Sequence, residues 1–186
     1  MNKKNPIILG IDPGTLVLGY GIIEVDKQKL KLLSMGVIHL SKYEDPLEKL
    51  KIIYEKVQSI IEHYKPIACA IETPFYGKNV QSMLKLGRAQ GVAIASALTN
   101  GVEVFEYSPK KIKQSVTGNG NASKEQVAAM LQRLINFELQ PKFLDATDGL
   151  AAAVCHHFQS KAGDIAASKK VAGWGEFIKQ NPARIR

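Results

Sequence analysis

Four acidic residues stand where buried segments of this sequence begin or end. Asp12 ends the apolar run PIILGID and Glu72 ends the run IACAIE, while Asp145 and Asp148 lie three positions apart in FLDATDGLAAAV. Ligands of open α/β sheets bind outside the carboxyl ends of the strands, so Asp12 and Glu72 can meet in one cleft. Carboxylates gathered in this way repel one another unless a cation neutralises them. Such hard oxygen ligands suit Mg²⁺ or Mn²⁺.

The spacing of the last two acids predicts that both project from one face of a helix. Each acid also has a plain structural interpretation. Asp12 precedes Pro-Gly and could be a turn former, Glu72 could cap the following loop, and Asp145 with Asp148 could be favourable charges near a helix N-terminus. Taken together, the four carboxylates instead favour a pair of metal ions about 3.5–4 Å apart, an arrangement that hydrolyses phosphodiesters.

The overall charge points to a polyanionic partner. The chain has 186 residues, of which 45% are hydrophobic, and 25 Lys and Arg against 17 Asp and Glu give a net charge of +8. Such an excess attracts nucleic acid, although a merely basic soluble protein would show it too. The length fits a single core, and we expect a domain over residues 1–163 followed by a basic tail over residues 164–186.

The cysteines and the N-terminus predict a reducing, cytoplasmic setting. Cys69 and Cys155 both lie in apolar runs, where a thiol usually behaves as a small buried hydrophobe. The apolar run near the N-terminus is too short for the core of a signal peptide, and no stretch approaches the roughly 20 apolar residues that a bilayer requires. We therefore expect no membrane partner.

The elements that must position the acids follow from the periodicity of the sequence. Dense β-branched residues bounded by turn formers predict strands over residues 6–12, 19–26 and 31–40, which form an antiparallel meander. Two further strands are expected over residues 67–72 and 102–107. The strand over residues 67–72 is apolar on both faces, so it should be central and covered by helices. Strands that alternate with helices predict one α/β domain with a mixed sheet.

Helical periodicity separates these strands. It predicts helices from Asp45-Pro46 to Lys65-Pro66 and from about Asn79 to Thr99. One or two helical turns should cover residues 109–116, and Ser123 with Gln126 forms a capping-box pattern at the start of the next helix. A last amphipathic helix is expected over about residues 142–160.

Four blocks of the sequence resemble the RuvC family of Holliday junction resolvases in order and approximate spacing. They are IDPGTLVLGYGII, AIETPFYGKNVQSMLKLGRAQGVAIASA, EYSPKKIKQSVTGNGNASKEQV and DATDGLAAAVCHH. The resemblance covers about residues 7–160. It implies an RNase H-like fold with a mixed five-stranded sheet and helices on both faces. It also implies a homodimer that cuts two strands of like polarity in a four-way DNA junction, in recombination and repair, together with RuvA and RuvB.

The resemblance assigns roles to the acids and to residues near them. It implies that Asp12, Glu72, Asp145 and Asp148 are the catalytic, metal-binding residues and that they hold two Mg²⁺ ions, for which Mn²⁺ can substitute. The residues that it assigns to DNA are Phe75, which would stack on a base, and Lys78, Lys113 and Lys124. Without the resemblance, Phe75 would be read as a core residue and the lysines as solvated charges.

Other interpretations of the sequence stay open at this point. A sugar kinase or actin-like ATPase also carries Asp, Gly and Thr near a hairpin, but it normally needs two such domains. A junction-binding protein without catalysis is a second alternative. Gly87, Gly91 and Ala95 form a smooth helical strip that could pack on the sheet or, by resemblance, on a second subunit. Leu16 is apolar where the family often has a polar residue, and the tail with Trp174 has no assigned role.

Overall fold

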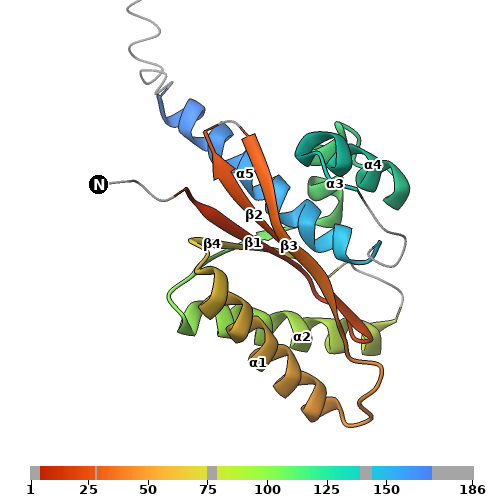
Figure 1. Cartoon of the computed structure of the whole chain (residues 1–186). Helices are drawn as coiled ribbons and strands as arrows, with labels where there is room; N and C mark the ends of the chain where they lie inside the picture. The colour runs from red at the N-terminus through yellow and green to blue at the C-terminus, as the bar shows by residue number, and fades with distance from the viewer. Residues whose placement is uncertain (1–4, 28, 75–78, 139–143, 169–186) are drawn as a thin grey trace, which may run out of the picture.

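The computed structural model describes residues 5–27, 29–74, 79–138 and 144–168, which form one five-stranded sheet with helices on both faces (Figure 1). The strand order is β3-β2-β1-β4-β5. β1 pairs antiparallel with β2 and parallel with β4, and β5 is parallel to β4. The predicted mixed sheet is therefore confirmed. The strands are β1 (Ile7–Asp12), β2 (Val17–Asp26), β3 (Lys29–His39), β4 (Ala68–Glu72) and β5 (Glu103–Tyr107).

The helices divide into two groups that cover opposite faces of the sheet. α1 (Pro46–Tyr64) and α2 (Val80–Thr99) pack on one face, and α5 (Ala146–Ser168) crosses the other, where α3 (Pro109–Thr117) and α4 (Lys124–Ile135) cover its start (Figure 1). Each group shares an apolar cluster with the strand residues that point toward it. This alternation follows from the two-residue period of a strand. The sheet is therefore the middle layer of three.

Local sequence signals fix where these helices begin. The side chain of Asp45 accepts a hydrogen bond from the amide of Leu47 ahead of a proline, which pre-orders the first turn of α1. At α4 the predicted capping box is present in both directions: Ser123 accepts from the amide of Gln126, and the side chain of Gln126 accepts from the amide of Ser123. Both starts therefore agree with the sequence prediction.

The last helix differs from its prediction at both ends. Asp145 lies in a turn just before α5 and not on the helix as predicted. Both carboxylates nevertheless project to the same side, because both contact Lys124. The hydroxyl of Thr147 donates to the carbonyl of Leu144 and closes that turn. α5 also continues to Ser168, past the predicted end at residue 160. The extra residues include three alanines and no proline, so the helix continues despite Gly163.

Glycines allow α5 to lie directly against β1 and β2. A Cβ atom placed on Gly10 would stand 2.1 Å from the carbonyl oxygen of Gly149, and one on Gly21 would stand 2.4 Å from the Cα of Leu150. Gly149 is equally confined, because its own Cβ would stand 2.6 Å from the Cα of Tyr20. The backbone of α5 therefore contacts the backbone of the sheet, which fixes the distance from the start of α5 to the end of β1.

We expect Gly10→Ala to destabilise the protein. Its Cβ would overlap backbone atoms of Gly149 and Ala153, so α5 must move. Overpacking of this kind costs about 2–3 kcal/mol, which lowers the melting temperature by roughly 4–12 °C for a chain of this size. Thermal unfolding followed by circular dichroism measures the change. Because the overlap is with backbone, Ala153→Gly should not rescue the variant; full rescue would contradict this explanation.

The remaining sequence predictions have mixed outcomes. Cys69 and Cys155 are free and buried, as predicted. Gly87, Gly91 and Ala95 are exposed, and a Cβ on either glycine would meet nothing within 4 Å, so this strip does not pack on its own sheet. In the part of the chain that the structure describes, no helix is long and apolar enough to cross a membrane. Trp174 and most of the predicted tail lie outside the described residues.

Candidate active site

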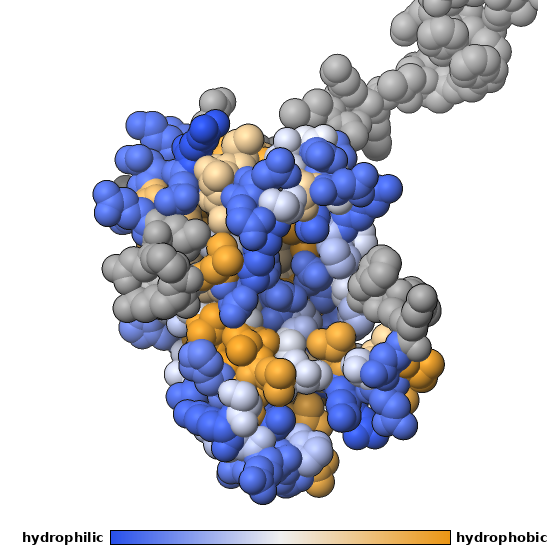
Figure 2. Space-filling view, turned by 90° about the vertical axis from the view of Figure 1, so that its right-hand side faces the viewer, coloured by the Kyte–Doolittle hydropathy of each residue, from blue (hydrophilic) through white to orange (hydrophobic). Residues whose placement is uncertain are grey.

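Three of the four acids face one cavity at the end of the sheet where β1 and β4 finish. Asp12, Glu72 and Asp148 line this cavity of about 270 Å³, which we call the acidic pocket. They come from β1, β4 and the first turn of α5. Figure 2 shows the face of the molecule at this end of the sheet. Hydrophilic residues line a hollow across its middle, and apolar patches border the hollow. Residues far apart in the sequence therefore converge on one open site.

The position of Asp12 and Glu72 follows from the pairing of their strands. β1 and β4 are parallel neighbours, and each acid is the last residue of its strand. Pro13 ends β1 because it cannot donate to the sheet. Beyond Glu72, the amide of Thr73 still donates to the carbonyl of Tyr107 on β5, so the end of β4 is held in place. Parallel strands thus deliver both carboxylates to the same edge.

The surroundings of these two carboxylates favour their protonated forms. The pKa of Asp12 is raised from 3.8 to about 7, chiefly by burial and also by repulsion from Asp148 and Asp145, while Lys124 opposes the rise. Burial likewise raises the pKa of Glu72 from 4.5 to about 8, with added repulsion from Asp12 and Asp148. Lys113 and Lys124 offset only part of this. Both acids therefore lack a full countercharge.

A lysine lies between the other two acids. The Lys124 Nζ atom is 2.7 Å from Asp145 Oδ1 and 2.7 Å from Asp148 Oδ2. Burial lowers the pKa of Lys124, but its hydrogen bonds to both carboxylates outweigh burial and leave the pKa above its usual value. Burial raises the pKa of Asp148 despite this contact. The Asp145 side chain is 62% exposed and is not part of the pocket wall, so Lys124 links it to the site.

The predicted DNA-binding residues fall into two sets. Lys113, on α3, and Lys124, at the start of α4, both line the acidic pocket. Phe75 and Lys78 lie outside the described residues. The sequence interpretation missed the apolar wall of the pocket, formed mainly by Ile112 and Val127. These two residues belong to the buried faces of α3 and α4, and the helical periodicity of both segments is the signal that could have indicated them.

The donor set of the pocket fits a hard divalent cation. Asp12, Glu72 and Asp148 offer only carboxylate oxygens, and the ammonium group of Lys124 shows that positive charge is favoured beside them. Among residues 5–27, 29–74, 79–138 and 144–168, no group of three or more His, Cys, Asp or Glu side chains is already arranged to hold a metal ion.

We expect the metal-free protein to lose stability as the pH rises from about 4 to 8. The folded-state pKa values of Asp12 and Glu72 exceed their unfolded values, so their contribution to stability is complete below about pH 4 and is lost as the pH passes about 7 and 8. Asp12→Asn and Glu72→Gln remove this titration. After discounting for partial exposure, each should stabilise the protein at pH 8 by about 1–2 kcal/mol, or roughly 2–8 °C.

Calorimetry in EDTA at pH 4 and pH 8 measures this effect. At pH 4 the variants and the wild type should melt at similar temperatures, because the acids are then protonated in the folded protein. A suitable control is Asp26→Asn, because Asp26 is an exposed acid at the far end of β2. If Asp12→Asn is less stable than the wild type at pH 8, the Asp12 carboxylate does not carry the uncompensated negative charge described above.

The sheet and the acidic pocket together indicate the class of nuclease to which this protein belongs. A mixed five-stranded sheet whose adjacent central strands both end in acids, with a further acid at the start of the helix across them, is the arrangement of an RNase H-like nuclease. The sequence profile described as "Crossover junction endodeoxyribonuclease RuvC" matches residues 8–156. The chain therefore belongs to the RuvC family, and the sugar kinase alternative is discarded.

Relatives match along almost the whole chain. The "Crossover junction endodeoxyribonuclease RuvC" of Cytophaga hutchinsonii is 58% identical over 191 aligned residues, which cover 100% of this chain and 94% of that protein. The protein of the same name from Bacteroides fragilis is 55% identical and covers 98% of this chain and 97% of its own length. The resemblance seen in the sequence is thus confirmed.

Solved structures support the fold independently. The structure titled "T. thermophilus RuvC in complex with Holliday junction substrate" superposes with a TM-score of 0.79 at 32% identity, covering 85% of this chain and 96% of that one. A yeast mitochondrial Holliday junction resolvase superposes with a TM-score of 0.60 at 17% identity, covering 86% of this chain and 83% of that one. At 17% identity the second likeness shows a shared fold only.

Proposed function

We propose that this protein is an endonuclease that resolves Holliday junctions by paired nicks in two strands of like polarity, in recombination and DNA repair. The observation that carries the proposal is the acidic pocket: acids from β1, β4 and α5 converge beside Lys113 and Lys124 in a member of the RuvC family. Carboxylates can hold the metal ions that hydrolyse a phosphodiester, and lysines can bind the phosphates of the DNA strand.

Asp12, Glu72 and Asp148, with Asp145 beside them, are the residues that would hold Mg²⁺, for which Mn²⁺ can substitute. Two such ions when bound lower the pKa of an attacking water and stabilise the leaving oxygen. Lys113 lies where it can bind a phosphate of the substrate. When Lys124 leaves Asp145 and Asp148, its ammonium group becomes free to bind a phosphate as well.

A homodimer supplies two identical sites for the two-fold symmetric junction. The exposed face of α2 supports it, because its apolar and small residues recur at helical spacing. Val80 and Leu84 are both 62% exposed and Leu98 is 57% exposed. The face, which we call the α2 stripe, consists of Val80, Leu84, Gly87, Gly91, Ala95 and Leu98. The glycines leave room for a second helix to approach closely, since nothing stands within 4 Å of their Cβ positions.

Substituting one residue of the α2 stripe tests the dimer. Leu84→Glu places a charge in the middle of the proposed contact and should convert the dimer to a monomer in sedimentation velocity at micromolar concentration. Leu134→Glu, on α4 and 38% exposed, is the matched control and should leave the dimer intact. If Leu84→Glu sediments as the wild type does, the stripe is not the contact between subunits.

The setting of the reaction completes the proposal. By family resemblance the protein works in the cytoplasm with the branch-migration proteins RuvA and RuvB. The alternative without catalysis, a protein that only binds and shapes junctions, shares the basic charge and the fold. It differs in one observable: it would bind a junction in Mg²⁺ without cutting it.

A cleavage assay therefore tests the function. The protein is incubated with Mg²⁺ and either a synthetic immobile four-way junction or a linear duplex of the same arm sequence. We expect two symmetric nicks in strands of like polarity in the junction and none in the duplex. Binding without cleavage would support the architectural alternative, and equal cleavage of both substrates would overturn junction specificity.

A further inference from the structure

A second cavity lies at the same end of the sheet as the acidic pocket but on its other face. It has a volume of about 270 Å³ and is enclosed by the turn that follows β1, the start of α1 and the middle of α2. We call it the hairpin pocket. Ligand pockets usually measure about 300–1,000 Å³, so this one suits a small group such as a single nucleobase and not a large ligand.

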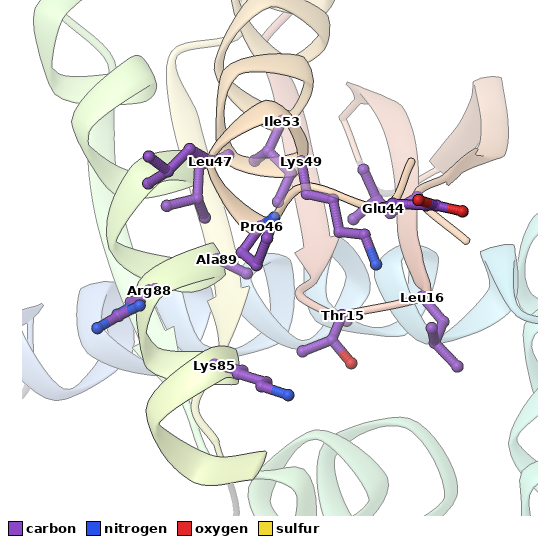
Figure 3. A pocket seen from close by; sticks show the side chains of 13 residues that line it. Thr15, Leu16, Glu44, Pro46, Leu47, Lys49, Ile53, Lys85, Arg88 and Ala89 are labelled. Atoms are coloured by element: carbon purple, nitrogen blue, oxygen red, sulfur yellow. The ribbon is translucent and has the colours of Figure 1, made fainter. Parts of the chain in front are cut away.

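The hairpin pocket combines an apolar wall with unpaired positive charge. Leu16 and Leu47 stand at its rim with exposed fractions of 59% and 68%. Lys49 and Lys85 extend toward the same opening from α1 and α2 (Figure 3). Within the described residues neither lysine forms an ion pair. Glu44 is the acid of the lining, so the charge there stays positive.

Among the described residues, the turn between β1 and β2 borders both pockets. Asp12, the last residue of β1, lines the acidic pocket, and Gly14 already lines the hairpin pocket. The acidic pocket is covered by α3, α4 and α5, and the hairpin pocket by α1 and α2. Because both pockets border this turn, one DNA strand that bends over it could contact both.

We propose that the hairpin pocket holds one unstacked nucleotide of the same DNA strand that occupies the acidic pocket. Its base lies against Leu16 and Leu47, and its phosphate lies between Lys49 and Lys85. A nucleotide matches both features, since it carries a flat, largely apolar base and an anion. This inference rests on the proposed function, because it needs a DNA strand in the acidic pocket.

Two double variants separate the base from the phosphate. Leu16→Ala/Leu47→Ala removes the apolar rim without changing charge, and both residues are exposed, so the fold is spared. Lys49→Gln/Lys85→Gln removes the two cations. The matched control is Lys29→Gln/Lys31→Gln: both of these exposed lysines lie at the start of β3, the far end of the sheet from the hairpin pocket.

The readout is binding of a four-way junction in Ca²⁺, which supports binding without cleavage, with 2-aminopurine placed in turn at each position beside the cut. For the wild type we expect fluorescence to rise at one position, because unstacking relieves quenching. The leucine variant should lose this rise. The lysine variant should bind roughly tenfold more weakly at low salt and lower the slope of log affinity against log salt by about 1, the value for one lost phosphate contact. The control should keep the rise and the wild-type slope.

The outcomes distinguish this proposal from the proposed function. If the wild type binds and cuts the junction but no position brightens, or if both pocket variants match the control, the hairpin pocket holds no nucleotide. If the pocket variants change the sedimentation of the free protein and not the affinity for DNA, the pocket belongs to the contact between subunits and this proposal is overturned. If the wild type neither binds nor cuts a junction, the proposed function itself fails.

Discussion

Asp12→Asn should reduce the rate at which a four-way junction is cleaved by roughly 10³-fold or more, as is typical when a central catalytic group is removed. Asp12 ends the central strand β1 and lines the acidic pocket together with Glu72 and Asp148. Asparagine has the shape of the protonated carboxyl that the metal-free site favours, so the fold should be retained. What is lost is one anionic oxygen ligand for a divalent ion.

The measurement is single-turnover cleavage in Mg²⁺, paired with binding of the same junction in Ca²⁺. Binding should remain close to that of the wild type, because phosphate contacts come from lysines and not from Asp12. Asp26→Asn makes the same chemical change at the far end of β2 and should cut normally. Normal cutting by Asp12→Asn would refute the role assigned to this residue.

Raising the salt concentration should weaken junction binding steeply. The chain carries a net charge of +8, and Lys113 and Lys124 stand at the acidic pocket. Each phosphate that such residues neutralise releases counterions, so affinity falls with salt. For about six to ten phosphate contacts, affinity should drop by roughly 10³–10⁵-fold between 50 and 200 mM salt. A titration by fluorescence anisotropy in Ca²⁺ measures the slope.

The same salt titration measures how much a single lysine of the site contributes to phosphate binding. Lys113→Gln should lower the slope by about 1, the value for one lost phosphate contact, and should weaken binding to all junction sequences alike. Lys29→Gln, at the far end of the sheet, serves as the control and should keep the slope. A flat titration of the wild type would show that charge is not the main source of affinity.

The sequence allowed the sheet edge to be predicted because its signals are local. Asp12 and Glu72 each close an apolar run, and the rule that parallel strands share an edge brings the two acids together. Ser123 and Gln126 carry the full capping box within four residues, so the start of α4 could be read directly. Signals of this kind need no knowledge of tertiary contacts.

Other features could not be predicted because they depend on contacts between distant segments. The spacing of Asp145 and Asp148 correctly suggested that they project to one side, but it placed Asp145 on α5, whereas the turn closed by Thr147 leaves Asp145 ahead of the helix. That Lys124 would join these two acids follows from the packing of α4 beside α5, which no local pattern encodes. The hairpin pocket likewise draws its wall from three separate segments.

The role of the small residues on α2 illustrates the same limit. Gly87 and Gly91 could have packed on the sheet or faced a partner, and the sequence alone did not decide between these alternatives. The register of α2 is set by buried residues on its opposite face, such as Ala89 and Ala93, which turn the glycines outward. The burial of one face therefore decided the exposure of the other.

The close contact of α5 with the sheet has a consequence for inhibitor design. Because α5 packs backbone to backbone against the sheet near Gly10 and Gly149, a compound that widened the acidic pocket by pushing this helix away would break that packing. The opposite wall carries the long side chains of Lys113 and Lys124, which can swing aside. Chelating scaffolds should therefore be extended toward α3 and α4, where the enzyme can adapt to added bulk.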